Sequence, residues 1–186
     1  ILREADDRPA IRARGEHQSQ WRTITRRELH EMVGAATEAM RLAGVVEGDR
    51  VVGYLPNIPE TIVAMLAAST LGAIWSSCSP DFGVRGVLDR FERLEPKLLV
   101  CCDGYSYGGK RIDCRPRTAE ILEALAKTTA SAPQVVMVPF LDPDATTEVL
   151  PQAVRWDDFL KQGEGFPPDL TPAPFGRPHY IMFSSG

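Results

Sequence analysis

Residues 51–77 read VVGYLPNIPETIVAMLAASTLGAIWSS, and they contain two short apolar segments separated by a longer one. Segments 51–55 and 73–77 have the length and composition of β-strands. The segment between them carries apolar residues on nearly every side, which is typical of a helix buried against a sheet. Pro59 fits the first turn of that helix, and Gly72 fits its end. We therefore predict a strand, a buried helix and a second, parallel strand.

The same alternation continues on both sides of this unit. Upstream, Thr25 and Glu28 form a capping-box pattern ahead of a helical apolar stripe that Gly44 ends. Downstream, we expect helices at 84–94 and 117–127 and strands at 98–101, 134–138 and 179–183. Strands separated by helices of this length indicate right-handed crossovers. The predicted fold class is α/β, with a mostly parallel sheet flanked by helices.

Residues 139–178 break the alternation. They contain eight prolines and little periodicity, apart from a short helix expected at 156–160. We interpret this stretch as an irregular connection within the domain and not as a domain of its own.

Composition argues against several classes of function. Hydrophobic residues make up 44% of the chain and charged residues 25%, as in an ordinary globular protein. The net charge of −4 provides no basic surface, so we expect no nucleic-acid partner. No apolar run is long enough to span a membrane. The four cysteines form no C-x-x-C pair, which argues against zinc and favours free thiols in a reducing compartment, the cytoplasm.

The chain ends in Ser184-Ser185-Gly186, directly after the predicted strand 179–183. Hydroxyls and backbone N–H groups in this position suit a phosphate-binding turn, and glycine lets the backbone approach an anion closely. An ordinary polar loop is the alternative, because the sequence contains neither the Walker nor the dinucleotide glycine pattern. Since a self-contained domain should not end at such a turn, we expect the chain to be an interior piece of a longer protein.

A second candidate site follows the predicted strand 98–101. Residues 103–111 read DGYSYGGKR, and loops beyond the carboxyl ends of parallel strands are where α/β sheets bind ligands. The adjacent glycines expose backbone donors, the two tyrosines offer stacking surfaces, and Lys110 and Arg111 add positive charge. These residue types suit a nucleotide or a phosphate. The alternative is a glycine-rich surface turn with solvated cations.

A third candidate is the stretch 76–83, SSCSPDFG, whose small polar residues could line a pocket. Cys78 has no histidine near it in the sequence, so we interpret it as a small packed residue and not as a nucleophile. The histidines at positions 17, 30 and 179 are each expected to be structural. We expect His17 to be exposed in a polar turn.

Together these segments resemble the adenylate-forming acyl-CoA synthetases. Residues 23–29, TITRREL, resemble the first core motif of that family, and residues 66–76 resemble its second. The Ser/Thr/Gly-rich phosphate loop of the family begins where this chain ends, at 183–186. Three longer strings are similar to the family members that activate acetoacetate: YLPNIPE at 54–60, GAIWSSCSPDFG at 72–83 and DGYSYGGK at 103–110. The resemblance extends over nearly all of residues 8–186.

The resemblance implies a two-step reaction with ATP, Mg²⁺ and CoA. A carboxylate attacks the α-phosphate of Mg-ATP, and the CoA thiol then displaces AMP from the acyl-adenylate. The family assigns the ATP phosphates to Ser184, Ser185 and Gly186. It assigns CoA to Gly108, Gly109 and Lys110, and also to Tyr107, which replaces an arginine of acetyl-CoA synthetases, and to Arg111. It identifies no catalytic residue and no metal ligand within this chain.

The resemblance also implies that residues 1–186 are an incomplete N-terminal adenylation domain, inactive alone, with a C-terminal domain further downstream. The expected partners are the small molecules acetoacetate, ATP and CoA; the oligomeric state is not indicated. One alternative is a ligase for another short-chain acid, such as acetate or butyrate. Others are a non-catalytic α/β module that binds CoA or an adenine nucleotide, and a Rossmann-like scaffold without a ligand.

Overall fold

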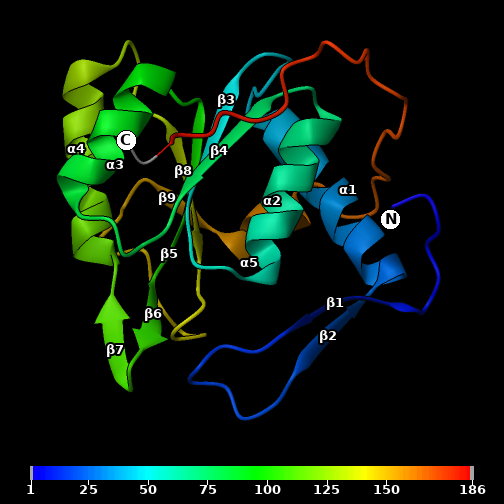
Figure 1. The fold of residues 1–186 in the computed structure, drawn as a ribbon, viewed down its shortest axis with the longest axis horizontal. Helices are drawn as coiled ribbons and strands as arrows, with labels where there is room; N and C mark the ends of the chain where they lie inside the picture. The colour runs from blue at the N-terminus through cyan, green and yellow to red at the C-terminus, as the bar shows by residue number, and fades with distance from the viewer. Residues whose placement is uncertain (1, 185–186) are drawn as a thin grey trace.

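The structure is a computed structural model that describes residues 2–184. A five-stranded parallel sheet lies at its centre in the order β4-β3-β5-β8-β9. Helices cover both faces of this sheet (Figure 1). The predicted fold class is therefore confirmed. The strands of the sheet are β3 (Arg50–Tyr54), β4 (Ile74–Cys78), β5 (Leu98–Cys102), β8 (Gln134–Val138) and β9 (Ala153–Arg155).

Each face of the sheet has its own hydrophobic core. One core joins the sheet to α1 (Arg26–Leu42), α2 (Pro59–Thr70) and α5 (Trp156–Lys161). The other joins it to α3 (Val84–Phe91) and α4 (Arg115–Thr128), which lie together on the opposite side in Figure 1. No helix within residues 2–184 is long and apolar enough to cross a membrane.

The predicted strand–helix–strand unit is β3, α2 and β4. The two strands pair in parallel from Arg50 opposite Ile74 to Tyr54 opposite Cys78. Gly53 is required in this pairing, because a Cβ atom there would lie 2.6 Å from the ring of Trp75. At the end of α2, Gly72 adopts a φ of 73°, the left-handed conformation that glycine tolerates.

Helix α1 begins and ends as its sequence predicts. The Thr25 hydroxyl accepts a hydrogen bond from the Glu28 N–H at 3.1 Å, and the Glu28 carboxylate accepts one from the Thr25 N–H at 2.7 Å. This pair of bonds is the expected capping box. After the helix, Gly44 has a φ of 78°.

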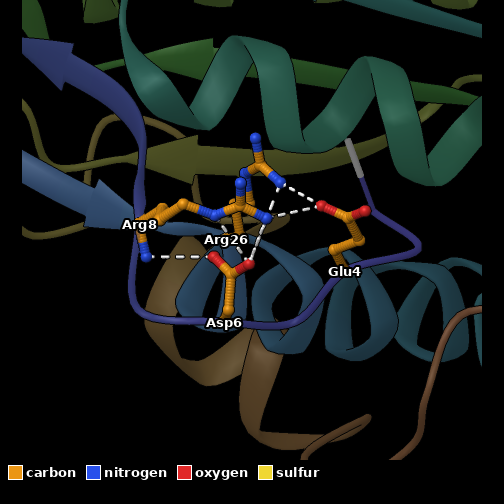
Figure 2. A network of polar contacts seen from close by, with 4 residues as sticks. All are labelled: Glu4, Asp6, Arg8 and Arg26. Carbon is orange, nitrogen blue, oxygen red and sulfur yellow. Dashed lines mark hydrogen bonds and ion pairs between the residues drawn. The ribbon is translucent and has the colours of Figure 1, made fainter.

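The N-terminal region contains a hairpin that the sequence did not reveal. Strands β1 (Pro9–Ala13) and β2 (Arg22–Thr25) pair antiparallel ahead of α1. A network of ion pairs holds the segment before β1 against the start of α1 (Figure 2). In it, Glu4 accepts from Arg8 at 2.6 Å and from Arg26 at 2.5 Å, and Asp6 also accepts from Arg8 at 2.6 Å. Much of this network is exposed to solvent, so its contribution to stability is small.

Two expected elements differ in the structure. The helix expected at 84–94 ends as α3 at Phe91 and continues as the 3₁₀ turn η1 (Glu92–Leu94). The strand expected at 179–183 is reduced to a single parallel bridge between Tyr180 and Trp75. Beyond this bridge the Ile181 carbonyl accepts from the Ser76 hydroxyl, at 2.8 Å, and the backbone ladder does not continue.

The stretch 139–178 is irregular outside β9 and α5, and β9 completes the sheet. Strand β9 lies within it and pairs in parallel with β8, from Val135 opposite Ala153 to Met137 opposite Arg155. Helix α5 follows β9 directly and packs on α1 and β8. The stretch is therefore part of the same fold as the rest of the sheet.

Candidate functional site

The glycine-rich segment forms an antiparallel hairpin and not the loop that we predicted. Strand β6 (Gly104–Tyr107) pairs with β7 (Lys110–Asp113), and Tyr107 lies opposite Lys110. Gly108 and Gly109 form the two-residue turn with φ values of 58° and 75°. Both angles are left-handed, as a type I′ turn requires, and glycine adopts them without strain. A Gly-Gly pair between two short polar–apolar strands was the signal for a hairpin in the sequence.

The base of this hairpin is fixed by Asp103, the residue between β5 and β6. Its buried carboxylate accepts three backbone hydrogen bonds, from Phe140 at 2.7 Å, Leu141 at 2.9 Å and Asp142 at 2.8 Å. Its carbonyl accepts from the Cys114 N–H at 2.8 Å, which closes the hairpin after β7. Asp103 therefore joins both ends of the hairpin to the connection that follows β8.

The tip of the hairpin is bound by Glu16, a residue that the sequence did not single out. Glu16 lies in the connection between β1 and β2, and its carboxylate accepts from the N–H of Gly108 at 3.1 Å and of Gly109 at 2.6 Å. The β1–β2 connection and the β6–β7 hairpin project from the same end of the molecule in Figure 1. Because Glu16 is 92 residues from Gly108 in sequence, no local pattern could have revealed the contact.

The side chains that we predicted for CoA differ in their surroundings. Tyr107 is 72% exposed, and Lys110 is exposed without an ion-pair partner within residues 2–184. Arg111, by contrast, donates a hydrogen bond from Nη2 to the Leu141 carbonyl at 3.0 Å. The hairpin thus presents one aromatic ring and one free ammonium group beside its turn. Arg111 has a structural bond in addition to its charge.

The loop after β4, residues 79–83, is joined to the same hairpin. The Tyr105 hydroxyl on β6 donates to Oδ1 of Asp81 at 2.5 Å. Loss of solvent, and then this bond to a carboxylate, raise the pKa of the Tyr105 phenol, so it stays protonated and remains the donor. The structure therefore brings our second and third candidate segments together at the carboxyl ends of their strands.

Two further side chains, those of Tyr54 and Arg117, bind the backbone of the 79–83 loop. The Tyr54 hydroxyl, at the end of β3, donates to the Phe82 carbonyl at 2.8 Å. Burial raises the pKa of the Tyr54 phenol, and the nearby Arg117 opposes that shift. Arg117 itself donates to the Pro80 carbonyl at 2.8 Å. These contacts fix the loop against β3 and α4.

Of the predicted ATP-phosphate residues, only Ser184 lies within the described part of the chain; Ser185 and Gly186 lie outside it. Ser184 is exposed. The Arg90 guanidinium on α3 lies 4.6 Å from the centre of the Phe82 ring and 5.7 Å from that of Phe183. The last described residues are therefore beside α3 and the 79–83 loop. They lie away from the tip of the β6–β7 hairpin (Figure 1).

The histidines have structural bonds. His17 is half-buried and not exposed as we expected, because its Nε2 donates to the Phe140 carbonyl at 3.2 Å and its ring packs edge-on against Phe140. Nδ1 of His30 pairs with the Leu2 carbonyl at 2.9 Å, and Nδ1 of His179 with the Ser69 hydroxyl at 3.2 Å. These bonds agree with the structural roles that we predicted for all three rings.

Cys78 is buried at the end of β4, as its interpretation as a packed residue requires. Burial raises the pKa of its thiol, which keeps the sulfur protonated and unreactive at neutral pH. The other three cysteines are also free and buried. The side-chain hydrogen bond with Cys102 lowers the pKa of the Cys114 thiol, whereas the Cys78 thiol has no such support for a nucleophilic role.

A family model described as AMP-binding enzyme matches residues 2–186. The chain belongs to the AMP-binding enzyme family. Over its whole length it is 42% identical to an acetoacetyl-coenzyme A synthetase of Rhizobium meliloti and 41% identical to an acetoacetyl-CoA synthetase of Mus musculus. It covers 28% of each of these relatives. The chain therefore spans only part of the length of these relatives.

A solved structure of an acetoacetyl-CoA synthetase from Streptomyces lividans has the same arrangement. It superposes with a TM-score of 0.83 at 37% sequence identity, over 97% of this chain and 26% of that one. The parallel sheet and its flanking helices are therefore those of an AMP-binding enzyme.

Proposed function

We propose that the protein containing this chain is an ATP-dependent ligase that joins acetoacetate to CoA. The reaction converts acetoacetate, ATP and CoA into acetoacetyl-CoA, AMP and diphosphate through an acyl-adenylate. The observation that supports this proposal is the similarity of the entire chain, about 40% in sequence and 0.83 in TM-score, to proteins named acetoacetyl-CoA synthetases. We further propose the cytoplasm as its compartment, since its four cysteines are free.

Within that protein, we assign this chain to part of the N-terminal adenylation domain. Ser184, Ser185 and Gly186 would begin the loop that surrounds the ATP phosphates, where hydroxyl and N–H groups offset the charge that moves onto diphosphate. Mg²⁺ would enter with ATP and neutralise the same phosphates. Within residues 2–184 no cluster of three or more carboxylate, thiol or imidazole groups could hold a metal ion. We expect the residues that bind the acetoacetate carboxylate next to ATP to lie outside this segment.

The β6–β7 hairpin is our candidate for the CoA contact. The exposed ammonium group of Lys110 suits the 3′-phosphate of CoA, since a lysine without an ion-pair partner is free to bind an anion. The exposed ring of Tyr107 offers a surface on which the adenine base can stack. Gly108 and Gly109 shape the turn between these two side chains. Arg111 adds charge at the start of β7.

The acid specificity can be measured on the complete protein. We expect kcat/KM for acetoacetate to exceed that for acetate and for butyrate when ATP and CoA are saturating. Acyl-CoA and AMP should form in equal amounts. A higher kcat/KM for acetate or butyrate would assign the protein to another short-chain acid. Binding of CoA with no acyl-CoA formed from any of the three acids would favour a non-catalytic module.

A further inference from the structure

We propose that Glu16 is a positioning residue for CoA, which holds the Gly108–Gly109 turn so that the side chains beside it keep their orientation toward the ligand. This inference rests on the proposed CoA role of the β6–β7 hairpin. Glu16 would act through the turn and would not itself touch CoA. Because Glu16 is 92 residues from Gly108 in the sequence, no local motif contains both residues.

The hairpin needs an external support. Strands β6 and β7 form a two-stranded sheet of their own, separate from the five-stranded sheet. A two-stranded hairpin is marginally stable by itself, and the bonds of Tyr105 and Arg111 to the rest of the fold do not involve the residues of the turn. Its last residues before and after the turn, Tyr107 and Lys110, are both exposed. Without a further contact the tip would move, and the two candidate ligand groups would move with it.

Glu16 provides that contact through both of its carboxylate oxygens. Oε2 accepts from the Gly108 N–H at 3.1 Å, and Oε1 accepts from the Gly109 N–H at 2.6 Å. The left-handed conformations of two successive residues direct both N–H groups toward one anion. Hydrogen bonds to a charged acceptor are stronger than neutral ones, so this pair is a specific restraint on the turn.

Glu16 is in turn held by its own segment. The Gly15 N–H donates to the Gln18 side chain at 2.8 Å, and the Gln18 N–H donates to the Gly15 carbonyl at 3.0 Å. A Cβ atom on Gly15 would lie 2.9 Å from the ring of Phe140, so the segment packs closely on that residue. His17 adds its hydrogen bond to the Phe140 carbonyl at 3.2 Å.

These contacts connect the base of the hairpin to its tip through Phe140. Phe140 donates its N–H to Asp103 at the base of the hairpin, and it contacts the segment that carries Glu16 to the tip. The base and the tip are therefore held by one connected set of residues. Since the N–H groups of Gly108 and Gly109 already bind Glu16, the contact with a ligand falls to the side chains of Tyr107 and Lys110.

The test uses the complete protein and three variants: Glu16→Ala, Glu16→Gln and Lys110→Ala. We expect Glu16→Ala to raise the KM for CoA about tenfold, the effect of losing roughly 1.4 kcal/mol of binding free energy. Glu16→Gln keeps one acceptor oxygen and should give an intermediate increase. In the two Glu16 variants, kcat should not change. The acetoacetate-dependent exchange of diphosphate into ATP, which requires no CoA, should also stay at the wild-type rate in these two variants. Glu148→Gln is the control, because Glu148 is an exposed carboxylate that belongs neither to the hairpin nor to the residues that hold it. This variant should match the wild type.

Each outcome separates the inference from the proposal on which it rests. A raised KM for CoA in Lys110→Ala, with a normal KM in both Glu16 variants, would overturn the role of Glu16 alone. A normal KM in all three variants would overturn the CoA role of the hairpin. A lower KM in Glu16→Ala would show that Glu16 competes with CoA and does not position the turn. Equal losses of diphosphate exchange and of CoA affinity would indicate a merely structural residue and overturn the inference. If the alanine variant does not fold, Glu16→Gln provides the same test.

Discussion

At the residue scale, Asp103 shows how one buried carboxylate can organise a site. It is 3% exposed, and both its oxygens are occupied by backbone donors from residues 140–142. A buried N–H that loses its acceptor keeps its full cost of desolvation. The connection after β8 and the base of the hairpin therefore depend on the identity of a single side chain.

We predict that Asp103→Asn lowers the free energy of unfolding by about 2–4 kcal/mol, because the amide NH₂ group would face an N–H donor. The midpoint of urea or thermal unfolding of the complete protein measures this loss. Asp144→Asn, at an exposed carboxylate close by, should stay within about 0.5 kcal/mol of the wild type. An Asp103→Asn protein as stable as that control would contradict the assigned bonds.

The capping box at Glu28 gives a prediction for pH. Hydrogen bonds from the Thr25 backbone, and then from its side chain, lower the pKa of the Glu28 carboxyl in the folded protein. A lowered pKa contributes stability above the unfolded pKa, and the contribution disappears as the pH falls through the folded value. We expect Glu28→Gln to lower the Tm at pH 6 and to have progressively less effect from pH 5 to pH 3. A Tm difference that stays constant over this range would contradict the prediction.

At the scale of elements, the packing of β3 on β4 limits what can replace Gly53. A Cβ atom there would lie 2.6 Å from one atom of the Trp75 ring and 2.7 Å from another. The ring is buried, so neither strand can move away freely. Overpacked positions of this kind cost about 1–3 kcal/mol.

We therefore predict that Gly53→Ala destabilises the protein by that amount, measured by the midpoint of thermal or urea unfolding. The matched control is Gly176→Ala, since a Cβ atom at Gly176 meets no atom within 4 Å. Equal stability of the two variants would mean that the strands adjust to the added methyl group.

The elements that the sequence predicted correctly share a physical feature. The strand–helix–strand unit at 51–77 and the capping box of α1 are encoded by local apolar periodicity and by residues adjacent in sequence. Strands β1 and β2 were missed, because they are only five and four residues long and each has a single isoleucine as its large apolar residue, too little for a clear alternation. Segment 179–183 was predicted as a full strand, because its apolar composition does not reveal that it pairs with β4 through a single bridge.

At the scale of the whole molecule, the candidate site is assembled from distant parts of the chain. The residue types of segment 103–111 and its place after a predicted strand identified it as a candidate, and the structure joins it to the 79–83 loop through Tyr105 and Asp81. Glu16 could not be predicted, because its role depends on two hairpins that meet only in the folded protein. The ATP-phosphate assignment of Ser184, Ser185 and Gly186 stays a prediction.

The central claim is that the complete protein forms an acyl-adenylate from acetoacetate. The measurement that tests it most directly is the exchange of labelled diphosphate into ATP, with the complete protein, Mg²⁺ and acetoacetate but no CoA. We predict exchange that depends on acetoacetate and stops when the acid is omitted. No exchange with acetoacetate under conditions where acetate or butyrate supports it, or ATP cleavage to ADP and phosphate, would contradict the account.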